Sequence, residues 1–84
     1  MFCFQEVCKL GYAYHSGKMV NGNAPAKNAD ECLKQCNTSP GCKFWDFGEN
    51  YCRLRSNNGK GQQVSRSYTS GPKYCKFGTD LLYK

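Results

Sequence analysis

The number and spacing of the cysteines constrain this chain more than any other feature. There are seven cysteines in 84 residues, and three of them follow the pattern Cys32-x3-Cys36-x5-Cys42 directly before an aromatic run. A chain this short rarely builds a hydrophobic core worth more than a few kcal/mol, so such domains commonly add cross-links. Disulfides persist only in oxidising compartments. The composition therefore predicts a small disulfide-stabilised domain that is secreted or extracellular.

A zinc site is the alternative use of these residues. Nominal ligands exist, because a tetrahedral zinc ion takes four thiolate or imidazole groups, and the chain offers Cys32, Cys36, Cys42, Cys52 and His15. No C-x2-C pair occurs, however, and the cysteines continue to both ends of the chain. That distribution favours a disulfide framework. We expect no metal and no cofactor.

The clearest local element is a helix from residue 29 to 37. Asn28 is a good N-cap, and Glu31 lies three residues later in the capping-box position. Ala29, Cys32, Leu33 and Cys36 then fall on one helical stripe. Proline and glycine in Ser39-Pro40-Gly41 end the helix.

The rest of the chain reads as short strands and turns. The aromatic run Phe44, Trp45 and Phe47 favours a strand and is predicted to be largely core. One or two short strands are expected between Cys3 and Tyr14, and a strand end at Met19-Val20 runs into a turn at Asn21-Gly22. The segment through Pro25 is predicted to be a loop. Three strands are expected afterwards, over residues 43–47, 51–55 and 64–68, with Ser70-Gly71-Pro72 ending the last.

The helical spacing suggests how the cysteines pair. Cys32 and Cys36 lie one turn apart on the same helix face, so bridges from this helix can reach two sheet positions. Cys36 would pair with Cys42 and Cys32 with Cys52. The remaining pair, Cys8 and Cys75, would join the two ends of the domain.

Several motifs together resemble the PAN/apple module. They are Ala29-x-x-Cys32-Leu33-x-x-Cys36, Gly41-Cys42-x-Phe44-Trp45-x-Phe47, Cys52-x-Leu54 and Ser70-Gly71-Pro72-Lys73-x-Cys75. The pattern covers nearly the whole chain and looks closest to the tandem modules of apicomplexan microneme adhesins. The resemblance implies an α+β fold, with a curved antiparallel sheet and one helix packed across it. It also implies a module spanning residues 8–75, with residues 1–7 as a linker or first strand and residues 76–84 as a linker.

Two features depart from the family pattern. Cys3 precedes the usual first cysteine, so either Cys3 or Cys8 could pair with Cys75. We expect Cys8 to do so and Cys3 to stay unpaired. The tail after Cys75 has no clear counterpart in the family.

Catalysis is poorly provided for. The only imidazole is His15, in a Tyr-His-Ser-Gly context typical of an exposed loop, and a cysteine nucleophile would need a thiol outside the disulfides. The acidic pair Asp30-Glu31 is explained by its place in the first helical turn. We therefore expect a protein that is not an enzyme.

Positive charge gathers in one part of the sequence. Residues 1–49 and 80–84 each balance, so the whole net charge of +6 lies in residues 50–79. A basic surface would attract sulfated glycans, acidic partner domains or membrane headgroups. The alternative is that these side chains serve solubility alone. The candidate contact residues are Arg53, Arg55, Lys60, Arg66 and Lys73.

These features lead to one main hypothesis and two alternatives. The resemblance implies a non-catalytic binding module of a secreted adhesin that attaches to host cells, with a host-surface protein or glycan and neighbouring modules as partners. Storage in the microneme would follow from that assignment. Nucleic acid is not expected as a partner, because disulfides place the chain outside the cell. Membrane insertion is not expected either, since the sequence lacks a long apolar run. The alternatives are an assembly module linked through Cys3 and an accessory domain of a serine protease precursor.

Overall fold

The computed structural model describes residues 7–20 and 24–77, and within them it contains one helix and seven short strands. The elements follow the chain in the order β1 (Lys9–Leu10), β2 (Tyr12–Ala13), β3 (Ala24–Pro25), α1 (Ala29–Thr38), β4 (Phe44–Gly48), β5 (Tyr51–Arg55), β6 (Gln62–Gln63) and β7 (Thr69–Pro72). Five strands form one antiparallel sheet in the order β1-β7-β4-β5-β3. β2 and β6 form a separate antiparallel pair.

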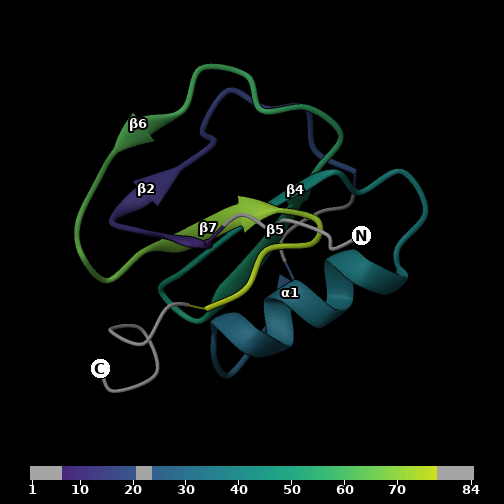
Figure 1. Cartoon of the computed structure of the whole chain (residues 1–84), viewed down its shortest axis with the longest axis horizontal. Helices are drawn as coiled ribbons and strands as arrows, with labels where there is room; N and C mark the ends of the chain where they lie inside the picture. The colour runs from purple at the N-terminus through teal and green to yellow at the C-terminus, as the bar shows by residue number, and fades with distance from the viewer. Residues whose placement is uncertain (1–6, 21–23, 78–84) are drawn as a thin grey trace, which may run out of the picture.

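The sheet lies between α1 and the β2–β6 pair (Figure 1). Because side chains alternate along a strand, β4 places side chains on both faces of the sheet, toward α1 and toward β2. Trp45 joins the buried cluster formed with the helix cysteines Cys32 and Cys36. Asp46 points the other way, and its carboxylate accepts a hydrogen bond from the backbone N–H of Tyr14, directly after β2.

The helix begins where the capping signals predict. Asn28 Oδ1 accepts a hydrogen bond from the Glu31 N–H at 2.9 Å, which satisfies one of the free donors of the first turn. The Glu31 carboxylate reaches one residue further back than a standard capping box and accepts from the Lys27 N–H at 3.0 Å. At the other end α1 extends to Thr38, one residue beyond the predicted end.

β4 and β5 form a tight hairpin. The two residues between the strands, Glu49 and Asn50, both have positive φ, at 54° and 66°. This is the conformation that a type I′ turn requires, and its twist matches that of the flanking strands. The observed β5 has the predicted bounds, and β4 is shifted by one residue from the predicted strand.

The sequence prediction is wrong for the last strand. Residues 64–68 form no strand, because this segment is a turn in which the Tyr68 N–H bonds to the Ser65 carbonyl. Ser70, Gly71 and Pro72 were expected to end a strand but belong to β7, between β1 and β4. A Cβ at Gly71 would lie within 3.5 Å of Cys8 and closer still to Cys75, so glycine permits this close approach.

Two further differences are small. Ala24–Pro25 pairs with β5 as a short edge strand where a loop was predicted, and proline is tolerated there because an edge strand can lack one donor. Met19 forms an isolated bridge to Arg55. The predicted turn at Asn21-Gly22 lies outside the described residues.

The aromatic run divides between core and rim. Trp45 is fully buried and donates from Nε1 to the Pro72 carbonyl at 3.0 Å. Phe44 and Phe47 are half-buried, on opposite faces of the sheet. The prediction that all three are core therefore holds fully only for Trp45.

The two ends of the described chain lie together. Val7 and Lys76 form a parallel bridge, and the Cys8 N–H donates to the Lys76 carbonyl at 2.8 Å. Cys3, the remainder of the predicted N-terminal linker and residues 78–84 lie outside the described residues.

Candidate ligand-binding groove

Three disulfides join the described cysteines. Cys32 and Cys36, one turn apart on α1, bond to Cys52 in β5 and to Cys42 just before β4. Cys8 bonds to Cys75, across 67 residues of sequence. All six cysteines are buried. The helix is thus fixed to the sheet at two points, and the ends of the domain at a third.

Arg53 and Arg55 do not form the predicted contact surface. Arg55 is only 4% exposed, its Nε lies 2.7 Å from Asp46 Oδ2, and its Nη1 donates to the carbonyls of His15 and Gly17. A Cβ at Gly17 would lie 2.8 Å from Arg55 Cδ, so the glycine gives the arginine its space. The buried Asp46 carboxylate requires this partner, since a lone charge in the interior is costly. Arg55 is a structural residue, which corrects its assignment as a ligand contact.

Arg53 also forms ion pairs within the domain. Its guanidinium lies 3.7 Å from Asp46 Oδ1 and 4.0 Å from Glu49 Oε1, with the side chain 17% exposed. It also lies over the ring of Tyr68. Arg53 and Arg55 lie on the same face of β5, and both turn toward Asp46. That shared face is covered by the β2 layer, however, so these two charges are compensated inside the domain.

The other predicted basic residues lie in separate environments. The Lys60 N–H bonds to the Ser16 hydroxyl, in the loop layer around β2 and β6. The Lys73 N–H bonds to the Lys43 carbonyl, and its ammonium lies over Tyr74. Arg66 is exposed in the turn before β7. The five residues predicted as one basic contact surface therefore do not make one.

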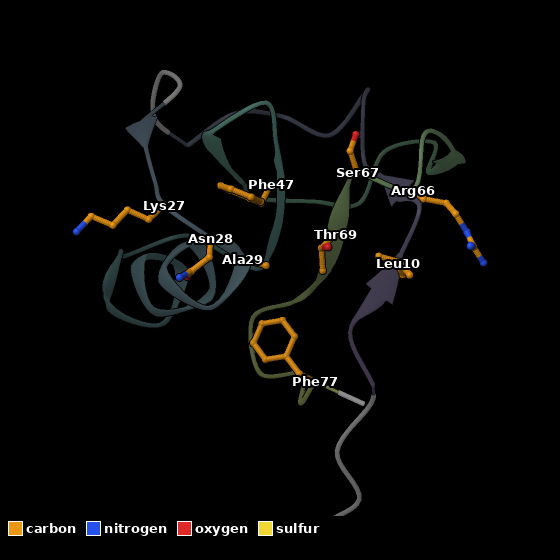
Figure 2. A pocket seen from close by; sticks show the side chains of 9 residues that line it. All are labelled: Leu10, Lys27, Asn28, Ala29, Phe47, Arg66, Ser67, Thr69 and Phe77. Atoms are coloured by element: carbon orange, nitrogen blue, oxygen red, sulfur yellow. The ribbon is translucent and has the colours of Figure 1, made fainter. Parts of the chain in front are cut away.

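Arg66 instead borders a groove beside the N-terminal end of α1. The groove has a volume of about 300 Å³, and its apolar floor comes from Leu10, Ala29, Phe47 and Phe77. Figure 2 shows these side chains between the helix and the β1–β7 edge of the sheet. Sheet register explains the arrangement, because Thr69 pairs with both Leu10 and Phe47. The ring of Phe77 is held edge-on against Trp45, with ring centroids 6.3 Å apart.

Two cationic side chains stand at opposite sides of this floor, Lys27 on the helix side and Arg66 on the sheet side, and in Figure 2 both extend outward from it. Both are exposed, and among the described residues neither has an ion-pair partner. The nearby acidic side chains already have other partners. Asp30 pairs with Lys34, and the Glu31 carboxylate accepts a hydrogen bond from the Lys27 backbone N–H. The hydroxyls of Ser67 and Thr69 complete the lining. The groove thus offers two free positive charges beside apolar surface.

Lys27 is the groove cation that the sequence reasoning missed. It lies in the part of the chain whose charges balance in sequence, so a count by segment gave it no weight. Its position directly before the predicted N-cap was the available signal, because it places a cation at the entrance of the helix. Charge that is balanced along a segment is not necessarily balanced in space.

Within residues 7–20 and 24–77, no group of three or more histidine, cysteine, aspartate or glutamate side chains is arranged to hold a metal ion. The helix found in this part of the chain is too short and too polar to cross a bilayer.

The fold matches that of a solved PAN module. The solved solution structure of a PAN module from Eimeria tenella superposes on the chain with a TM-score of 0.61, covering 95% of this chain and 93% of the other at 18% identity. The chain therefore has the PAN module fold, as its cysteine and aromatic motifs predict. No protein-family sequence model matches the chain, and no curated protein sequence matches it either.

Proposed function

We propose that this protein is a non-catalytic extracellular binding module that recognises an acidic ligand through the groove between α1 and the β1–β7 edge. The observation that carries the proposal is the pair of unpartnered cations, Lys27 and Arg66, on either side of an apolar floor. Binding sites combine concave apolar surface with a few placed polar groups in this way. The disulfide-dense composition supports an extracellular setting.

An adhesive role in attachment to host cells follows as the biological context of this proposal. The similarity in fold to a PAN module from an apicomplexan supports it. A host-surface protein or a sulfated glycan would supply the acidic groups, and secretion through the microneme would bring the module to them. Lys60 and Lys73 are left as exposed or half-exposed charges outside the groove.

Heparin is a suitable probe of whether the groove carries the acidic preference. The wild-type protein is expected to be retained on a heparin column and to elute as salt rises, because exposed charges are screened beyond about 8 Å at physiological ionic strength. The double variant Lys27→Gln/Arg66→Gln should elute at clearly lower salt.

The matched control is Lys43→Gln/Lys60→Gln. It removes the same number of charges from exposed lysines that do not line the groove. Elution of this control close to the wild type supports the groove. Equal losses in both double variants would mean that net charge alone drives retention, and an unchanged groove variant would remove the groove from the proposal.

A further inference from the structure

The lining of the groove is more apolar than a binding site for a fully charged glycan requires. Leu10, Ala29, Phe47 and Phe77 supply its apolar side chains, with Thr69 between Leu10 and Phe47, and the charges stand only at its two sides. A chain of sulfated sugars needs repeated cations and has no large apolar group to place on such a floor. The lining of the groove therefore indicates a ligand that has an apolar group as well as negative charge.

We infer that the groove binds an acidic segment of a partner protein, in which a large apolar side chain lies between carboxylates. This inference rests on the proposed function and names the ligand class at the same site. The apolar side chain would pack against Leu10, Phe47 and Phe77. The flanking carboxylates would pair with Lys27 on the helix side and Arg66 on the sheet side.

The size of the groove agrees with a short segment. A volume of about 300 Å³ lies at the lower end of the range of ligand pockets. It accommodates one large side chain with its neighbours rather than the surface of a folded domain. Arg66 also suits a carboxylate partner, because the planar guanidinium can donate two parallel hydrogen bonds to it.

The hydroxyls of the lining add hydrogen-bonding groups for a peptide backbone. Thr69 lies in β7 at the register position shared with Leu10 and Phe47, and Ser67 lies two residues before it. Among the described residues, no side-chain partner is seen for the Thr69 hydroxyl, whereas the Ser67 hydroxyl is shared with Ser65. A peptide lying across the floor would meet both hydroxyls between the two cations.

The test uses capped pentapeptides titrated into isotope-labelled protein and followed by NMR. The first peptide has phenylalanine at its centre and two aspartates on each side. The second replaces phenylalanine with glycine, and the third replaces every aspartate with asparagine. We expect the first to shift backbone signals around Lys27, Phe47 and Thr69, and each of the other two to bind about tenfold more weakly, since one buried aromatic side chain or a set of ion pairs is worth that factor.

Two protein variants assign the binding to the groove. Leu10→Ala shortens the floor at a residue that is 38% exposed, so the fold should tolerate it. It is expected to weaken the two peptides that contain phenylalanine and to leave the glycine peptide unchanged. Lys27→Gln/Arg66→Gln should weaken both aspartate peptides, whereas Lys43→Gln/Lys60→Gln should weaken neither.

The outcomes separate this inference from the function on which it rests. If heparin retention depends on Lys27 and Arg66 but the phenylalanine and glycine peptides bind equally, the protein-segment inference is wrong and the acidic-ligand function stands. If neither heparin nor any peptide responds to the groove variants, the proposed function itself fails. Selective binding of the phenylalanine peptide, lost in Leu10→Ala, supports the inference.

Discussion

The two faces of the central sheet are held by different chemistry, although the same strands supply both. Toward α1 the sheet presents Trp45, Cys52 and Leu54, which pack with the helix cysteines in a covalently linked apolar cluster. Toward β2 it presents Asp46 with Arg53 and Arg55, a buried ionic group. Alternation along β4 and β5 is enough to produce both surfaces.

The comparison shows that a buried surface in so small a domain need not be apolar. On the helix face, disulfides limit the conformations of the unfolded chain and apolar contacts fill the interior. On the other face, stability depends on each charge keeping its partner, because the interior does not solvate a lone ion. The two faces should therefore fail under different perturbations.

The largest effect on stability is expected from reducing the three disulfides. The loop-entropy estimate gives about 2 to 4 kcal/mol for each bridge, and the bridge closing the longest loop, Cys8 to Cys75, contributes most. Loss of all three disulfides is comparable to the whole net stability of an ordinary domain. Full reduction should therefore unfold the protein, as followed by circular dichroism. A native spectrum that persists after complete reduction would show that the ionic face and the core suffice alone.

The next largest effect should come from the ionic side. Asp46→Ala leaves the Arg55 guanidinium buried without its carboxylate, which is expected to lower the free energy of unfolding by about 3 to 5 kcal/mol. Denaturant unfolding with the disulfides intact measures it. The double variant Asp46→Ala/Arg55→Met is the control, because it removes the more deeply buried of the two arginines that Asp46 pairs with and should be less destabilised than Asp46→Ala. If the double variant is worse, the arginine contributes mainly through its bonds to the His15 and Gly17 carbonyls.

A smaller effect is expected at the start of the helix. Asn28→Ala removes the acceptor for the Glu31 N–H and should cost about 1 kcal/mol. Asn28→Gly should cost only a few tenths of a kcal/mol, since glycine is also tolerated at this position. Thermal unfolding of the two variants compares them. Because the disulfides already anchor α1, equal stability of Asn28→Ala and the wild type would mean that covalent linkage alone fixes the helix.

The sequence was informative where local rules and global structure agree. The helix follows from Asn28, Glu31 and the stripe through Cys32 and Cys36, and the one-turn spacing of those cysteines leads to the pairings seen in the structure. The strand from Tyr51 to Arg55 also has its predicted bounds. Each of these elements depends on contacts within a few residues or on a covalent link.

The sequence was misleading where pairing with a distant segment determines which residues form a strand. Residues 64–68 alternate as a strand would, yet the pairing goes to Thr69–Pro72, whose glycine and proline argued for a strand end. Glycine is needed at Gly71 because Cys8 and Cys75 pass so close to the backbone. No pattern within β7 itself reveals that approach.

The candidate site was only partly predictable. Arg66 was identified from charge, but Arg53 and Arg55 pair with Asp46, which lies directly opposite Arg53 on the adjacent strand β4. The sequence does not show that the β2 layer covers this face of the hairpin. Phe47 was assigned to the core and proves to be half-buried on the groove floor. Lys27 was hidden by the balance of charges in its segment. Which charges remain free depends on the packing of the whole domain.

The meeting of the two ends of the domain has a mechanical consequence. A tension applied through the backbone at Val7 and Lys76 reaches Cys8 and Cys75 within one residue on either side, and the load then crosses the Sγ–Sγ bond. The helix and the hairpin lie outside that load path, whereas Phe77 of the groove floor lies on it. A pull on the two ends would therefore leave the helix and the hairpin unstretched, and of the groove residues it would act first on Phe77.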